Sequence, residues 1–119
     1  MDTENLLTVD VQDHPSGVPV VSVHGDVDLA TAPAFQEAID RQVTTGQDFV
    51  VDMDGVKFLS SAGLAVLVDT STRMTAKNLR WALVAGHTAV TRPLEITGLT
   101  PVLPVFTSVL AALEALSGG

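Results

Sequence analysis

The chain has 119 residues, of which 46% are hydrophobic and 4% aromatic, so it suits one domain over residues 1–119 with a core of mainly Val, Leu and Ala. It has no cysteine, which excludes disulfides, thiolate catalysis and thiolate metal sites. Six basic and fourteen acidic residues give a net charge of −8, which argues against nucleic acid as a partner because a phosphate backbone would be repelled. The acidic residues are spread along the chain, which favours a solvated surface or a protein partner with a basic face.

No segment has the character of a membrane span or a secretory signal. The longest unbroken apolar run, Leu64–Val68, is far shorter than the roughly 18 residues that a membrane helix needs. The first residues, Met1–Asn5, are acidic and lack a basic segment. We therefore expect a cytoplasmic protein without membrane insertion.

The hydrophobic pattern alternates between short strands and amphipathic helices along the chain. The predicted strands are Thr8–Gln12, Val18–Val23, Phe49–Asp52, Trp81–Val84 and Val102–Phe106. The predicted helices run from Thr31 to Gly46, from Ser61 to Lys77, from Thr88 to Ile96, and from Thr107 or Ser108 to Leu116. Segment 117–119 is expected to be a frayed end.

Turn and breaker residues set the expected boundaries of these elements. The cluster His14–Gly17 predicts a turn between the first two strands, which are then antiparallel, and Gly25 is expected to stop the second strand. Thr31 is a suitable cap for the first helix, and Pro93 is expected to kink or shorten the third. The order ββαβαβαβα indicates an α/β fold, with helices packed on a mixed, mostly parallel sheet.

The segment Phe58–Leu64 places two hydroxyls, Ser60 and Ser61, between a buried strand and the predicted start of a helix. A helix N-terminus has unpaired N–H groups and a partial positive charge, so it favours an anion such as a serine-borne phosphate. Serine at such a position is also a common structural cap, worth about 1 kcal/mol. Ala62 and Gly63 are small enough to let another backbone come close.

Four segments together resemble the STAS domain family, in particular the small bacterial anti-sigma factor antagonists. They are His24–Asp28, Val51–Val56, Phe58–Leu64 and Arg92–Leu99. Each segment is weak alone, but their order and spacing are specific, and the resemblance covers nearly the whole chain. It implies the STAS fold.

The resemblance also implies a regulatory function and not an enzymatic one. In the family, a serine-specific anti-sigma kinase phosphorylates the loop serine of the antagonist. The unphosphorylated antagonist captures the kinase and frees the sigma factor, and a phosphatase resets the modified form. Counting back from Gly63, the acceptor falls on Ser61. Ser60 stands where the family usually has Asp, so Ser60 is the second choice and the modified serine stays open.

The expected partner surface surrounds Ser61. Leu64, Leu67 and Val68 define the inner stripe of the helix, so Ala65, Val66 and Asp69 are expected to point outward. Asp28 has two interpretations, either a carboxylate close to Ser61 or a turn cap, whereas Asp26 is expected to be plain surface. The predicted partner-binding residues are Asp28, Ser60, Ser61, Ala62, Gly63, Ala65, Val66 and Asp69.

Two other functional classes compete with this interpretation. A STAS protein that is not phosphorylated would sense a nucleotide or a lipid, or serve as an accessory subunit of a membrane complex. A hydrolase built on Ser61, His24 and an Asp is disfavoured, because Leu59–Gly63 lacks the first Gly of a nucleophile elbow.

His14, His24 and His87 have no metal-ligand spacing, so no metal and no cofactor are expected. Trp81 is expected to be a packed strand residue.

Overall fold

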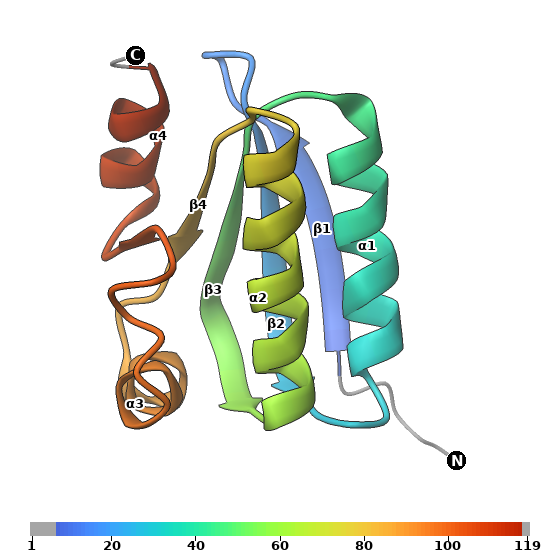
Figure 1. The fold of residues 1–119 in the computed structure, drawn as a ribbon, viewed down its shortest axis with the longest axis vertical. Coiled ribbons are helices and arrows are strands. Elements are labelled where there is room, and N and C mark those ends of the chain that lie inside the picture. The colour runs from blue at the N-terminus through green and yellow to red at the C-terminus, as the bar shows by residue number, and fades with distance from the viewer. Residues whose placement is uncertain (1–6, 118–119) are drawn as a thin grey trace.

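The computed structural model describes residues 7–117, which form one five-stranded sheet with helices against both of its faces (Figure 1). The strands are β1 (Leu7–Asp13), β2 (Pro19–Val27), β3 (Phe49–Leu59), β4 (Trp81–Val84) and β5 (Val105–Phe106). The helices are α1 (Ala32–Thr45), α2 (Ser61–Ala76), α3 (Thr88–Ile96) and α4 (Val109–Ser117). The element order ββαβαβαβα predicted from the hydrophobic pattern is confirmed.

The strands lie in the order β1-β2-β3-β4-β5. Only the β1–β2 pair is antiparallel, because a tight turn joins these two strands; in this turn the Gly17 N–H donates to the His14 carbonyl at 2.7 Å. The remaining pairs are parallel, since a helix carries the chain back between them. The predicted mixed, mostly parallel sheet is therefore confirmed.

Two cores lie on opposite faces of the sheet, because successive side chains of a strand point to opposite sides. Val21 and Val23 of β2 join the larger core under α1, α2 and α3, whereas Val20 faces the smaller core under α4. In Figure 1, α1 and α2 lie side by side in front of the sheet. Phe49 and Trp81 pack within the larger core with ring centroids 6.3 Å apart.

Two strands run further than the sequence pattern predicts. Strand β2 continues through Gly25 to Val27, and β3 extends to Leu59 instead of ending at Asp52. Gly25 has a φ of +107°, and the β2–β3 register shifts beside it, so this glycine absorbs an irregularity inside the strand instead of ending it. The extension matters because it pairs Val27 with Leu59 and brings the two following loops together.

The helix ends differ from expectation only locally. Gly46 ends α1 in the left-handed conformation with a φ of +74°, as predicted. Lys77 is the residue that follows the last turn of α2, and Pro93 lies inside α3, which runs over all of the predicted range Thr88–Ile96. Ser108 caps α4, since its Oγ accepts from the Ala111 N–H at 3.1 Å.

At the C-terminal side, the predicted edge strand Val102–Phe106 is reduced to the two residues of β5. The expected frayed end begins one residue too early, because Ser117 belongs to α4, and 118–119 lie outside the described residues. The acidic segment Met1–Asn5 also lies outside them. Within residues 7–117, no helix combines the length and the hydropathy that a membrane span requires.

Candidate functional site

The two serines sit where β3 turns into α2. The Ser60 N–H donates to the Val27 carbonyl at 2.8 Å, which fixes the end of β3 against the end of β2. Ser60 has an extended backbone with φ −88° and ψ 175°, so it is the residue preceding the helix, and Ser61 is the first helical residue. At the start of the helix, the Leu64 N–H donates to the Ser60 carbonyl at 3.0 Å.

The two hydroxyls have opposite environments. Ser61 is exposed, whereas the Ser60 Oγ is shielded from solvent and has no hydrogen-bond partner. Ser60 occupies the capping position but its side chain makes no capping hydrogen bond, so the structural role expected of a serine there is not realised. A second protein can therefore reach the hydroxyl of Ser61 and not that of Ser60.

Gly63 explains how the start of α2 lies so close to the sheet. A Cβ at this position would stand 2.5 Å from Leu59 Cδ1 and 2.6 Å from Val27 Cγ1, so no larger residue fits without movement. The close approach predicted for this glycine is present, although side chains make it and not another backbone. Gly63 thus fixes the height of Ser61 above the ends of β2 and β3.

Asp28 acts as a turn cap in the loop between β2 and α1. Its Oδ1 accepts from the N–H groups of Ala30 and Thr31, each at 3.0 Å. Thr31 occupies the capping position of α1 but makes no side-chain cap; its hydroxyl donates instead to the Asp26 carbonyl at 2.8 Å. Asp28 follows Val27, which pairs with Leu59, so its loop borders the Ser60–Ser61 turn. Asp26 is half-buried and not plain surface.

The residues exposed on α2 differ from the predicted ones by a rotation about the helix axis. Val66 was predicted to point outward but is only 5% exposed, and Val68 was predicted to point inward but is 37% exposed. The reason is that α2 packs against α1 as well as against the sheet, so its buried arc turns toward α1. Ala65 and Asp69 are exposed, as expected.

The predicted partner-binding residues therefore divide by accessibility. Ser61, Ala65 and Asp69 are exposed, Asp28, Ser60 and Ala62 are half-buried, and Gly63 and Val66 are buried. A substitution of Val66 by Glu would consequently disturb the packing of α2 on α1 and could not report on binding alone.

An ion pair braces α1 against α2 near this face. The Arg73 guanidinium on α2 donates to Asp40 Oδ1 on α1 and lies 3.5 Å from Asp69. The hydrogen bond from Arg73, supported by one from Gln36, holds the pKa of the Asp40 carboxyl below its usual value. The same contact raises the pKa of Arg73.

Beside Ser61, a groove of about 470 Å³ runs between the first turns of α1 and α2. Leu29 on the loop before α1 stands at its edge and is 82% exposed. We call this the α1–α2 groove; it is lined by Leu29, Ala32, Pro33, Gln36, Ala62, Ala65, Val66 and Asp69. Sequence reasoning missed Leu29 and Pro33, although a large apolar residue in a loop beside Asp28 was a visible signal.

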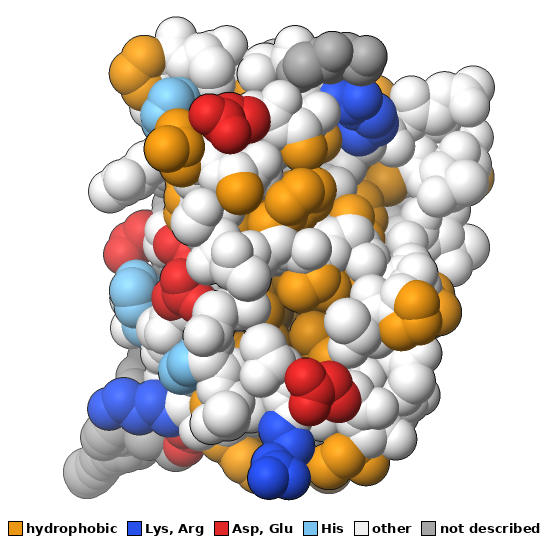
Figure 2. Space-filling view, turned by 90° about the vertical axis from the view of Figure 1, so that its left-hand side faces the viewer, with side chains coloured by type: hydrophobic (Ala, Val, Ile, Leu, Met, Phe, Trp, Pro, Cys, Tyr) orange, Lys and Arg blue, Asp and Glu red, His pale blue; other side chains and the backbone are white. Residues whose placement is uncertain are grey.

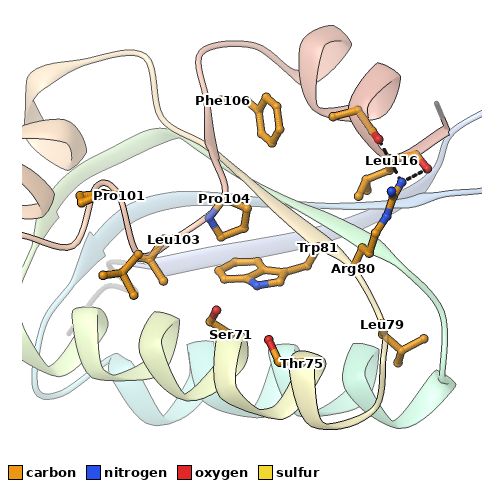
Figure 3. A pocket seen from close by; sticks show the side chains of 12 residues that line it. Ser71, Thr75, Leu79, Arg80, Trp81, Pro101, Leu103, Pro104, Phe106 and Leu116 are labelled. Atoms are coloured by element: carbon orange, nitrogen blue, oxygen red, sulfur yellow. Dashed lines mark hydrogen bonds between the residues drawn. The ribbon is translucent and has the colours of Figure 1, made fainter. Parts of the chain in front are cut away.

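A second groove, of about 480 Å³, lies at the opposite end of α2. Ser71 and Thr75 of α2 point toward the indole of Trp81, with Pro104 and Leu103 on its other sides (Figure 3). We call this the Trp81 groove; its lining is Ser71, Thr75, Leu79, Arg80, Trp81, 101–104, Phe106, Ala115 and Leu116. Figure 2 shows hydrophobic side chains gathered on this side of the molecule, between α4 and α3.

The histidines serve local structure. His87 immediately precedes α3, and its Nε2 lies 2.7 Å from the Val56 carbonyl, to which it donates. His24 lies inside β2 and not at its end, with its ring over Gly55, where a Cβ would stand 2.1 Å from Nδ1. In the described part of the chain, no three His, Asp or Glu residues gather as a metal site would require.

Comparisons with known proteins identify the family. A sequence model of the STAS domain matches residues 9–112. The chain is 35% identical over 120 residues to the anti-sigma-F factor antagonist RsfB of Mycobacterium tuberculosis, covering 100% of this chain and 97% of that protein.

Solved structures agree with this result. The crystal structure of an anti-sigma factor antagonist from Mycobacterium paratuberculosis superimposes with a TM-score of 0.86 at 37% identity, covering 93% of this chain and 94% of that one. The anti-sigma factor antagonist SpoIIAA, in its unphosphorylated form, shares the fold with a TM-score of 0.77 at 15% identity, covering 94% of this chain and 98% of that one. The fold, the four motif segments and these matches together show that the chain belongs to the STAS domain family.

Proposed function

We propose that this protein is an anti-sigma factor antagonist that binds an anti-sigma factor serine kinase, releases the sigma factor, and is switched off by phosphorylation of Ser61. One observation carries the proposal: Ser61 is an exposed serine at the start of a helix, next to an exposed apolar groove. The names of the relatives, both anti-sigma factor antagonists, support the same function.

The charge of a phosphate explains how one modification would end binding. The kinase transfers the γ-phosphoryl group of ATP to the Ser61 Oγ, ADP leaves, and the hydroxyl proton passes to a base of the kinase. The phosphate adds roughly 1.5 to 2 negative charges, which the helix N-terminus accommodates within the antagonist. A partner surface packed against the neutral serine would instead bury an unpaired charge, at a cost of several kcal/mol.

The α1–α2 groove gives the proposed interface its geometry. Leu29 is the large exposed apolar side chain of its lining, and Ala62 and Ala65 add small apolar side chains from the first turns of α2. Asp69 contributes the acidic residue of the lining, in a chain whose net charge is −8. A fitting partner surface therefore presents an apolar pocket for Leu29 and a Lys or Arg side chain opposite Asp69, which lies further along α2 than Ser61.

The remaining parts of the proposal follow from the family. Residues 1–119 act as one regulatory STAS domain in the cytoplasm, without an enzymatic activity of their own. A phosphatase removes the phosphate from Ser61 and restores binding. The exposed position of Ser61 is compatible with access by both enzymes.

Mapping the phosphate tests the acceptor. The protein is incubated with its cognate kinase and ATP, and the modified residue is located by mass spectrometry. Ser61→Ala should abolish the modification, and Ser60→Ala should leave most of it, because the Ser60 Oγ is shielded from solvent. Phosphate on Ser60, or none at either serine, would overturn the assignment.

A binding measurement tests the switch. Ser61→Glu should weaken the complex with the kinase at least tenfold, corresponding to about 1.4 kcal/mol. Thr75→Glu is the matched control, since Thr75 is also an exposed hydroxyl residue of α2 but lines the Trp81 groove. Equal losses for the two variants would mean that added charge anywhere on α2 prevents binding, and the specific role of Ser61 would fail.

A further inference from the structure

The Ser60 hydroxyl is a buried side-chain oxygen at this turn that makes no hydrogen bond in the unmodified protein. A buried hydroxyl without a partner costs free energy relative to an apolar side chain of similar size, so its presence needs an explanation. Capping of α2 does not supply one, because Ser60 makes no capping hydrogen bond.

The surroundings leave this hydroxyl free for a new acceptor. In the loop that follows β2, the Thr31 hydroxyl donates to the Asp26 carbonyl, and Asp28 Oδ1 accepts from the N–H groups of Ala30 and Thr31. The Ser60 N–H is also used, by the Val27 carbonyl. The side chain of Ser60 has one rotatable carbon–carbon bond, Cα–Cβ, and rotation about it changes the direction of the O–H without moving the backbone.

We propose that Ser60 is a positioning residue for the modified state, and that its hydroxyl donates a hydrogen bond to the phosphate on Ser61. This inference rests on the proposed modification of Ser61. A phosphate presents strong acceptor oxygens directly beside the unused donor. The hydrogen bond is stronger to the doubly charged phosphate than to the singly charged one, so Ser60 favours full ionisation of the group.

The residue type matters at this position. A carboxylate before the acceptor would repel the phosphate, whereas a hydroxyl attracts it. Ser60 therefore gives this chain a donor that is idle in the binding form and occupied in the released form. The result is a modified state in which the phosphate is held against the antagonist's own helix start and away from the departing partner.

Phosphorus NMR on a protein carrying phosphoserine at position 61 tests the hydrogen bond. The phosphoserine is incorporated during translation, so the test requires no kinase and stands even if kinase recognition fails. The second pKa of the phosphate should be higher in Ser60→Ala than in the parent by about 0.5 unit or more, because the donor to the dianion is lost. Ser60→Thr, which keeps a hydroxyl, should restore a value close to the parent's.

The charged groups around the site are unchanged in these variants and cancel in the comparison. On the elements that meet at this turn, the charged residues nearest to it along the chain are Asp26 and Asp28 from the β2 side, Lys57 on β3 and Asp69 on α2. Phosphate pKa values that agree within about 0.2 unit between the parent and Ser60→Ala would overturn the proposal.

Urea unfolding gives a second test, because Ser60→Ala should affect the unmodified protein and the phosphoserine protein differently. In the unmodified protein, Ser60→Ala should leave the urea midpoint unchanged or raise it, because it removes a buried hydroxyl without a partner. In the phosphoserine protein, the same substitution should lower the midpoint. A merely structural serine would lower both midpoints equally, and that result would overturn the proposal. If the kinase fails to modify Ser61 while the NMR shift is present, the proposed function fails and the hydrogen bond stands.

Discussion

The two grooves at opposite ends of α2 are nearly equal in size, about 470 Å³ beside Ser61 and about 480 Å³ beside Trp81, but they differ in chemistry. The α1–α2 groove has Leu29 almost fully exposed at its edge, an acidic residue in its lining and an accessible serine next to it. The Trp81 groove lies over an indole that is 5% exposed, and its lining contains no acidic residue.

The rims of the grooves differ as well. At the Trp81 groove, the Arg80 guanidinium is engaged by the chain itself, because it donates to the carbonyls of Ala115 and Leu116 at the end of α4. At the α1–α2 groove, Leu29 and Ala65 make the apolar wall available to another protein. Volume therefore does not separate the two sites, whereas the exposed serine at the helix start and the acidic residue in the lining are found only beside the α1–α2 groove.

The same negative charge, placed on the rim of each groove in turn, should produce the largest difference in binding. Leu29→Asp should weaken the complex with the anti-sigma kinase by about 2 kcal/mol, the level of a central interface residue. Val102→Asp is the matched control, because Val102 is 60% exposed at the Trp81 groove. Calorimetric titration measures both, and urea unfolding should show both variants within about 0.5 kcal/mol of wild type. A loss of affinity for Val102→Asp alone would place the interface at the Trp81 groove.

Gly63 is the residue on which the geometry of the Ser61 end depends. Gly63→Ala should lower the free energy of unfolding by about 1–2 kcal/mol, because the new Cβ collides with Leu59 and Val27. Ala65→Ser adds one atom at an exposed position of the same helix and should cost no more than about 0.5 kcal/mol. Urea denaturation compares them. An unchanged midpoint for Gly63→Ala would mean that the start of α2 moves easily, and the fixed position argued for Ser61 would be lost.

The ion pair between Asp40 and Arg73 braces the walls behind the α1–α2 groove and gives a smaller, pH-dependent effect. The pKa of Asp40 is lowered in the folded protein. The ion pair therefore contributes to the free energy of unfolding at pH values above the unfolded pKa of about 3.9. This contribution is lost as the pH falls through the folded pKa. Asp40→Asn should therefore cost less than about 1 kcal/mol at neutral pH, since both side chains are partly exposed. The difference from wild type should vanish at acidic pH, and urea unfolding across this range checks it. A difference that persists in acid would have another origin.

The Trp81 groove should give no response to small ligands. Trp81 is the only tryptophan of the chain, so its fluorescence reports on this groove alone. Under the proposed function, titration with nucleotides or fatty acids leaves its emission unchanged. A saturable change that Thr75→Glu abolishes would favour instead the alternative in which the domain senses a nucleotide or a lipid.

Local patterns in the sequence were sufficient for most of the fold. Trp81–Val84 and Thr88–Ile96 were predicted with the boundaries that the structure has, because their apolar periods are clear and breakers flank them. Gly25 was misread as a stop because a glycine inside a strand and one after it look alike in sequence. Only the pairing with β3 shows that the strand continues to Val27.

The sequence by itself determined the order of elements, the family motifs and the placement of two serines at the start of α2. Tertiary structure decided which of the two serines is accessible. It also buried Val66 and exposed Val68, the reverse of what helical periodicity predicts. The physical reason is that helical periodicity identifies one buried face, whereas α2 contacts two neighbours, the sheet and α1, and the second contact depends on residues far away in the chain. The same long-range packing brings Leu29 and Ala65 to the lining of one groove, which no spacing along the chain predicts.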